Sequence, residues 1–277
     1  MNDDGLFLTP EEVQASQVFL DRGYIIQPAE SPTDLARIRT LVTNAAAEYL
    51  KVKPENIAGL LDHVHSMVTP QALNGLRLHV MHRLNQTPWT RPAYYRLARN
   101  LLGTLVGNEL AMQLRLNLSI QLPGDTGSLL PVHADTWSGD SPFEVVLWVP
   151  LVDCHDTKSM YLLPPKQAER LHNEFSRLGG TNSEDLYKKI EPDLIWMGVD
   201  YGEVLLFNQN LPHGNRVNEE PLTRWTMNCR FKAVFTPYAD KQLGEFFEPI
   251  TLRAASRLGL GYRLPEIGRR TMGHREG

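Results

Sequence analysis

The first half of the chain carries its apolar residues with the period of an α-helix. A capping box at Thr9–Glu12, with Pro10 in the first helical position, predicts a helix that runs to Arg22. Gly23 and the apolar residues after it indicate a short strand. Ser31–Asp34 opens a second helix, whose apolar face is formed by Leu35, Ile38, Leu41, Val42 and Ala45. Residues 56–107 are also predicted to be mostly helical, most clearly from Pro92 to Gly107.

The period changes from 3.6 to 2 at Leu114, which predicts a strand. Its apolar face consists of Leu114, Leu116, Leu118 and Ile120, and its polar face of Arg115, Asn117, Ser119 and Gln121. Two interpretations fit this pattern. In the first, the polar face of an antiparallel strand is solvated. In the second, the apolar face packs on the N-terminal helices and the polar face lines a pocket.

The rest of the chain reads as short strands separated by turn residues, with a few helices. We expect strands at 143–153, 159–165, 193–199, 203–207 and 224–235, and helices at 166–178, 183–190 and 251–260. Helices followed by many short strands predict a mainly β protein with helices, of the α+β class, in which a helical layer covers a barrel-like sheet sandwich. No repeat or linker divides it, so we expect a single domain: helical support at 1–110, the sheet core at 111–236 and an extension at 237–277.

The amino-acid composition argues against several classes of function. A net charge of −4 over 277 residues, without a run of Lys and Arg, gives no reason to expect nucleic acid. No apolar stretch is long enough to span a membrane, and the acidic N-terminus lacks a signal-peptide core. The two cysteines, Cys154 and Cys229, are too few for a disulfide framework, which favours a cytoplasmic protein.

The candidate chemistry begins with the pair His133 and Asp135. On an extended segment, side chains two residues apart point the same way, so an imidazole and a carboxylate would lie side by side. One more histidine would complete the 2-His-1-carboxylate triad that binds Fe(II) in non-haem oxygenases. His213, at the end of a strand-like run, is the best third candidate. Arg224 opens the next strand and could bind a carboxylate with its guanidinium fork, although a fold-stabilising salt bridge would also explain it.

The other histidines offer weaker alternatives. His63 and His65 would not face each other on a helix. His79 and His82, three residues apart, could share a helix face and form a second candidate metal pair. His155 lies in a polar, turn-like cluster that is more often solvated than ligating.

At this point the chain resembles the Fe(II)/2-oxoglutarate-dependent oxygenases, in particular their phytanoyl-CoA dioxygenase-like branch. The resemblance covers roughly residues 20–235. Its matching parts are Gly23–Ile26, His133–Asp135, Trp148–Asp153, Gly202–Phe207, His213–Asn215 and Arg224. Within this branch, the chain looks most like oxygenases found with bacterial carbohydrate-biosynthesis clusters.

The resemblance implies a double-stranded β-helix, or jelly-roll, core and the cofactors Fe(II), 2-oxoglutarate and O2. It implies that His133, Asp135 and His213 bind the iron and that Arg224 anchors the distal carboxylate of 2-oxoglutarate. By position, Trp148, Asn117 and Asn215 would also line the cosubstrate site. Family members that halogenate lack the carboxylate ligand, so the presence of Asp135 favours hydroxylation. The segment Ser159–Lys166 departs from the family pattern and puts the substrate class in doubt.

The substrate is expected to be a small polar molecule such as a sugar or nucleotide-sugar. Trp137 has the parity of His133 and Asp135 and could stack on a ring, or pack on its own loop. Asn228 and Arg230 have the parity of Arg224 and could reach the pocket, although Arg230 could equally pair with an acid. Residues 166–182 could form a lid or only a surface helix.

Two other classes of function remain open. A cupin-like metal protein, such as an isomerase or epimerase that performs no oxidation, could use the same barrel. It would have no need of Arg224 as a dicarboxylate anchor. A non-catalytic binding module is the third reading, and the presence of all three metal ligands and the arginine counts against it.

Overall fold

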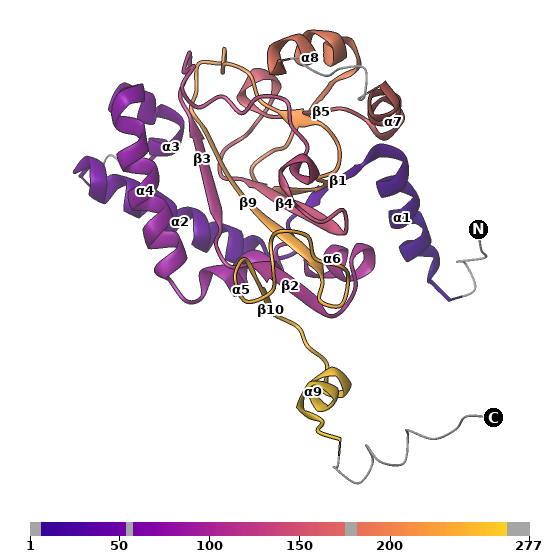
Figure 1. Cartoon of the computed structure of the whole chain (residues 1–277). Helices are drawn as coiled ribbons and strands as arrows, with labels where there is room; N and C mark the ends of the chain where they lie inside the picture. Colours follow the sequence, from indigo (N-terminus) through magenta and orange to yellow (C-terminus); the bar gives the residue numbers. More distant parts are fainter. Residues whose placement is uncertain (1–6, 54–57, 175–181, 265–277) are drawn as a thin grey trace, which may run out of the picture.

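Helices lie on both sides of a central antiparallel sheet in the computed structural model (Figure 1), which describes residues 7–53, 58–174 and 182–264. The helices α2, α3 and α4 lie on one side of β3 and β9, and α1 lies on the other side of the molecule. The helices α7 and α8 lie at the end that also holds β5. The helices are α1 (Pro10–Arg22), α2 (Pro32–Leu50), α3 (Leu60–His63), α4 (Pro70–Gln86), α5 (Thr90–Arg96), α6 (Arg99–Leu105), α7 (Pro165–Glu174), α8 (Ser183–Ile190) and α9 (Ala254–Gly261).

The strands form two sheets. The larger has seven strands in the order β1-β7-β4-β9-β2-β10, with β3 also pairing with β9, and the smaller has the order β6-β5-β8. All of these pairs are antiparallel. The strands are β1 (Tyr24–Pro28), β2 (Leu110–Gln113), β3 (Asn117–Gln121), β4 (Glu144–Pro150), β5 (Tyr161–Leu162), β6 (Ile195–Trp196), β7 (Glu203–Asn208), β8 (His213–Gly214), β9 (Arg224–Ala233) and β10 (Phe247–Pro249).

The first helices form where their capping residues predict them. Thr9 and Glu12 make both hydrogen bonds of the capping box at the start of α1. The helix ends at Gly23, whose φ of 81° is a left-handed conformation that glycine adopts without strain. The Ser31 side chain caps α2, whose face of Leu35, Ile38, Val42 and Ala45 is buried. These predictions are confirmed.

The single helix predicted from Pro92 to Gly107 is instead two helices, α5 and α6. Ala98 between them leaves the helical region, with φ −146° and ψ 33°. The break is stabilised by Glu30, which is distant in sequence. Its N–H donates to the Leu97 carbonyl at 2.9 Å, and its carboxylate accepts the N–H groups of Asn100 and Leu101 at 2.8 and 3.0 Å. The carboxylate therefore caps α6, for which no capping residue stands next to the helix.

Side chains along β3 and β9 face alternately toward the hydrophobic core and toward a cavity. Leu116, Leu118 and Ile120 are buried, as are Trp225, Met227 and Phe231 on the same side of β9. The opposite faces pair Asn117 with Asn228, Ser119 with Thr226 and Gln121 with Arg224. Ser119 and Arg224 line a cavity, so the second interpretation of this polar face is the correct one.

Several strands are shorter than predicted. The strand predicted from Leu114 begins only at Asn117, after the separate strand β2. The segment 159–165 contributes only the two residues of β5, and the segment 193–199 only the two of β6, whose start follows a turn of 3-10 helix at Glu191–Asp193. Both belong to the small sheet, and this sheet also holds His213.

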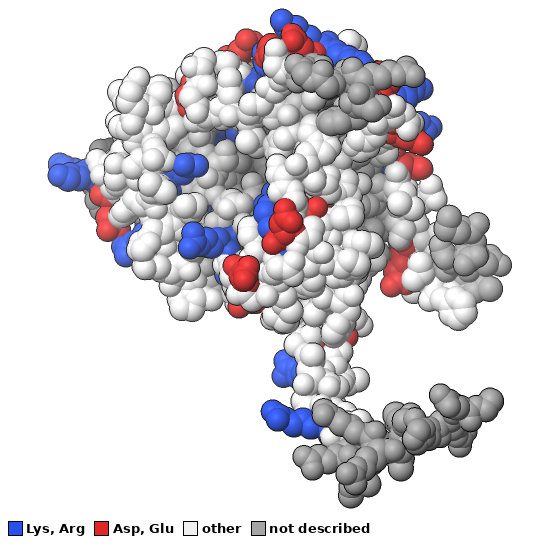
Figure 2. Space-filling model, viewed as in Figure 1, with Lys and Arg blue, Asp and Glu red and all other residues white. Residues whose placement is uncertain are grey.

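Acidic and basic side chains are interspersed on the face shown in Figure 2. Cys154 and Cys229 are both free and buried, and burial raises the pKa of each thiol to about 12. Among the described residues, no helix combines the length and the apolarity that a membrane crossing needs.

Two leucines of α4 offer a matched test of the helical layer. Leu76 is fully buried, whereas Leu78 is 48% exposed. We expect Leu76→Ala to lower the free energy of unfolding by about 2–5 kcal/mol, because it leaves a cavity between α4 and its neighbours. Leu78→Ala should change it by less than about 0.5 kcal/mol. Urea unfolding followed by circular dichroism measures both, and equal effects would show that α4 does not pack as described.

Candidate active site

The three predicted metal ligands lie together. One ligand atom from each of His133, Asp135 and His213 falls within 4.8 Å of the others, and this is the only group of at least three such side chains among the described residues. His133 and His213 are paired as in an antiparallel sheet: His133 N donates to His213 O at 3.0 Å, and His213 N donates to His133 O at 2.8 Å. The two imidazoles are therefore held side by side, with ring centroids 4.3 Å apart.

Backbone carbonyls orient both imidazoles. His133 Nδ1 lies 2.9 Å from Pro131 O, and His213 Nδ1 lies 2.8 Å from Leu211 O. A carbonyl oxygen can only accept, so each Nδ1 carries the proton and each Nε2 keeps a free lone pair. His133 Nε2 is 3.5 Å from Asp135 Oδ1. Two neutral imidazoles and one carboxylate with free lone pairs facing a common point are a donor set that fits a divalent metal ion.

The charge states favoured at His213 and Asp135 match this donor set. Burial and the neighbouring His133 lower the pKa of His213 to about 4, which keeps its imidazole neutral. Burial pushes the pKa of Asp135 upward, but the hydrogen bond to His133 and the charge of Arg230 outweigh it, so this pKa lies below its ordinary value. For His133, burial acts to lower the pKa, and the hydrogen bonds to Asp135 and Pro131 raise it overall.

Gly214 is required next to His213. A Cβ atom at this position would lie 2.6 Å from the Leu130 carbonyl oxygen and 2.6 Å from the Tyr161 hydroxyl. Any side chain here would push apart β8, β5 and the segment that carries His133. The glycine therefore lets the two histidine-bearing segments approach each other.

Arg224 is buried and no carboxylate forms an ion pair with it among the described residues. Its Nη1 donates to Ser159 O at 2.9 Å and its Nη2 to Ser119 Oγ at 3.1 Å, while its Nε has no partner. Burial lowers the pKa of the guanidinium to about 10. The salt-bridge explanation of Arg224 is therefore wrong. A buried guanidinium with neutral partners has donors suited to an anion.

A cavity of about 80 Å³ connects Arg224 with the metal ligand His213. Three further predicted residues, Trp148, Asn215 and Asn228, line it. Its remaining wall consists of Ser119, Leu130, Met160, Phe207, Gly214 and Thr226. The hydroxyl-bearing Ser119 and Thr226 were not predicted as site residues, although each has the strand parity of a residue that was.

The remaining predicted residues lie outside this cavity. Asn117 does not line it but donates to Asn228 Oδ1 at 2.9 Å, so its contact with the cavity is indirect. The Arg230 guanidinium lies 2.8 Å from Asp135 Oδ2.

The strand-parity argument for Trp137 fails, because Asp135–Ser138 is a turn of 3-10 helix. Trp137 is 36% exposed and makes an edge contact with His172 of α7. A substrate role for Trp137 stays a prediction.

The competing histidines make other contacts. His79 packs against the Tyr49 ring, and His155 lies 2.7 Å from Asp200 on the surface. The proposed lid, residues 166–182, is described in part: α7 extends to Glu174 and buries Ala168 and Leu171, and residues 175–181 lie outside the described residues. A lid function stays a prediction.

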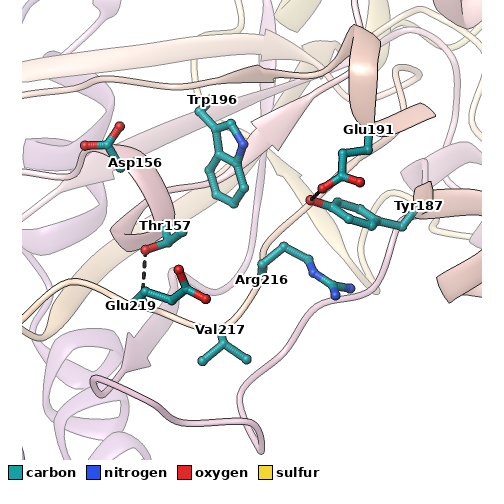
Figure 3. Close-up of a pocket in the computed structure, with 8 residues that line it drawn as sticks. All are labelled: Asp156, Thr157, Tyr187, Glu191, Trp196, Arg216, Val217 and Glu219. Carbon is teal, nitrogen blue, oxygen red and sulfur yellow. Dashed lines mark hydrogen bonds between the residues drawn. The ribbon is translucent and has the colours of Figure 1, made fainter. Parts of the chain in front are cut away.

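Two other cavities are larger, and the first adjoins the small one. One, of about 510 Å³, lies between α4 and β3 and shares Ser119, Leu130, Asn215 and Arg224 with the small cavity. The other, of about 480 Å³, is shown in Figure 3 and lies beside Trp196 and Tyr187. The Arg216 guanidinium stacks on the Tyr187 ring there and is paired with Glu184. None of the predicted site residues lines the cavity of Figure 3.

Solved structures support the resemblance. The nickel complex of the non-haem monooxygenase ThoJ matches with a TM-score of 0.54 and 14% sequence identity, over 91% of this chain and 89% of that chain. This chain has the fold of a non-haem oxygenase. HygX from Streptomyces hygroscopicus, solved with nickel and 2-oxoglutarate bound, matches with a TM-score of 0.50 and 17% identity, over 85% of this chain and 90% of that chain. No family model and no curated protein sequence matches the chain.

The predicted jelly-roll fold is thereby confirmed. The larger and smaller sheets are the two layers expected of it, and the triad lies where β8 of the smaller sheet meets the segment before Asp135. At these sequence identities the likeness concerns the fold, and the chemistry has to be argued from the residues of this chain.

Metal affinity tests the triad directly. We expect the protein to bind one Ni²⁺ or Co²⁺ ion, and His213→Ala to weaken binding by more than about 100-fold, because it removes a ligand. His155→Ala is the matched control, since His155 also neighbours an aspartate but is exposed. Isothermal titration calorimetry measures all three proteins. Equal affinity in His213→Ala and the wild type would rule out His213 as a ligand.

Proposed function

We propose that this protein is an Fe(II)/2-oxoglutarate-dependent dioxygenase that hydroxylates a small polar substrate. The observation that carries the proposal is Arg224, a buried cation that has no ion-pair partner in the described part of the chain. It lies at the far end of a cavity that begins at His213, one of the proposed metal ligands. A cosubstrate with two carboxylates needs a metal for one end and a cation for the other. An isomerase or epimerase that performs no oxidation needs only the metal.

His133, Asp135 and His213 would hold Fe(II) through two Nε2 atoms and one carboxylate oxygen. Arg224 would bind the distal carboxylate in a bidentate fork, and the Ser119 and Thr226 hydroxyls would complete that end of the site. The guanidinium already has its orientation fixed by Ser159 and Ser119, so little side-chain entropy is lost on binding.

The middle of the cavity supplies orientation and excludes water. Trp148 and Phe207 are 5% and 2% exposed and form apolar walls. Asn228 and Asn215 provide the polar contacts. Buried surroundings strengthen the attraction between a carboxylate and Arg224, because the effective dielectric constant is lower than in water.

With Fe(II), 2-oxoglutarate and O2 bound, the chemistry supplied is oxidation of 2-oxoglutarate to succinate and CO2, with one oxygen atom entering a C–H bond of the substrate as a hydroxyl. Within the family that the chain resembles, the carboxylate ligand Asp135 favours hydroxylation over halogenation. The substrate we propose is a ring-shaped polar molecule such as a sugar or nucleotide-sugar, on which Trp137, exposed two residues after Asp135, would stack.

An anaerobic titration of the metal-free protein with Fe(II) and 2-oxoglutarate tests the proposal. We expect the visible charge-transfer band of a chelated 2-oxo acid, and its loss in Asp135→Ala. Absence of the band although the metal binds would overturn the proposal. The alternative hypothesis, a metal-dependent isomerase, would then be tested with other divalent metal ions.

Arg224→Met separates cosubstrate binding from metal binding. We expect the dissociation constant for 2-oxoglutarate to rise at least about 30-fold, because a desolvated charge pair is lost, with metal affinity unchanged. The free protein should not be destabilised, since the arginine has no charged partner to lose. Arg83→Met, an exposed arginine of α4, is the control. Unchanged 2-oxoglutarate binding in Arg224→Met would remove Arg224 from the site.

A further inference from the structure

Arg230 makes its closest contact with a metal ligand. Its Nη2 lies 2.8 Å from Asp135 Oδ2, whereas the other oxygen of the same carboxylate, Oδ1, is the one that faces His133 Nε2 at 3.5 Å. The two carboxylate oxygens of Asp135 therefore have different contacts. One points toward the second metal ligand, and the other is engaged by a guanidinium.

The Arg230 side chain is held on its other side as well. Its Nε lies 3.1 Å from Gln209 Oε1 and 3.2 Å from Asp140 Oδ1. Asp140 is paired with Lys241, and Gln209 donates to Glu144 Oε2 at 3.0 Å. The guanidinium is thus fixed between a carboxylate and an amide and cannot turn away from Asp135 without losing both.

Burial makes these contacts stronger than a surface salt bridge. The side chains of Arg230, Asp135 and Asp140 are 15%, 8% and 1% exposed. Charges in such surroundings are poorly screened, and removing one partner leaves another uncompensated. Arg230 also lies on the same face of β9 as Arg224, Thr226 and Asn228. One strand therefore presents groups to the cavity and to the metal ligand.

We propose that Arg230 is a positioning residue that keeps Asp135 a monodentate metal ligand by occupying its Oδ2. A carboxylate that binds with both oxygens takes one more coordination position, and a site that has to accept a chelating cosubstrate and O2 needs all the positions that a facial triad leaves open. Arg230 thereby preserves an open position, without touching metal or cosubstrate. This inference rests on the proposed function and concerns the same site.

The number of water molecules on a bound Mn²⁺ ion measures the open positions and requires no catalysis. We expect the wild-type protein with Mn²⁺ to hold about three exchangeable waters, counted by ¹⁷O-water electron–nuclear double resonance and water proton relaxation. Arg230→Met should hold fewer, because the freed Oδ2 takes one position. Arg230→Lys should restore the wild-type number, since its ammonium can still reach Asp135.

Arg96→Met is the matched control, because Arg96 forms a two-point ion pair with Asp34 far from the triad. It should leave the water number unchanged. An unchanged water number in Arg230→Met would overturn the inference, even if Mn²⁺ binding became weaker, because a merely structural role predicts only the weakening. Arg230→Leu, which also has no donor for Oδ2, serves the same comparison if the methionine variant fails to fold.

The outcomes also separate this inference from the proposed function. If the wild type binds no Mn²⁺, both fail. If the water number falls as expected but no 2-oxoglutarate band forms with Fe(II), Arg230 positions a metal ligand in a protein with another activity, and only the proposed function fails.

Discussion

The site depends on the reciprocal backbone pair between His133 and His213. These residues are distant in sequence, and a single two-residue strand and an isolated bridge bring them together. Their backbone hydrogen bonds set the distance between the imidazoles, and the carbonyls of Pro131 and Leu211 set the direction of each ring. The two candidate histidine ligands are thus positioned by main-chain groups, and Gly214 is the residue that lets the two segments come close enough.

Two arginines on β9 have different roles in the proposed site. Arg224 has neutral partners and is proposed to bind an anion, whereas Arg230 forms ion pairs with two carboxylates. The difference follows from their surroundings. Arg224 is desolvated between Ser119 and Ser159, while Arg230 lies among Asp135, Asp140 and Gln209. The same residue type on the same face of β9 can therefore bind a ligand at one end and orient a metal ligand at the other.

The sequence predicts those parts of the fold and the site that local patterns determine. The capping box of α1, the glycine that ends it and the alternation of β3 and β9 are local, and all appear as expected. The break between α5 and α6 could not be predicted, because Glu30 supplies its hydrogen bonds from another element. The surroundings of Arg230 have the same origin, since Asp140, Gln209 and Lys241 reach it from three separate segments. The prediction that Trp137 points the same way as His133 and Asp135 assumed an extended chain. It failed because Asp135–Ser138 forms a turn of 3-10 helix.

The support of Asp140 by Lys241 has a consequence for the order in which the protein matures. Lys241 lies in the segment between β9 and β10, about 100 residues after Asp140, and β10 joins the large sheet at its edge beside β2. During synthesis the ribosome releases the segment of His133 and Asp135 long before this support exists. The ionic cluster behind the metal ligand can close only when nearly the whole chain has emerged. Nascent chains that stop before Lys241 would therefore contain the three triad residues without the ion pair that holds Asp140.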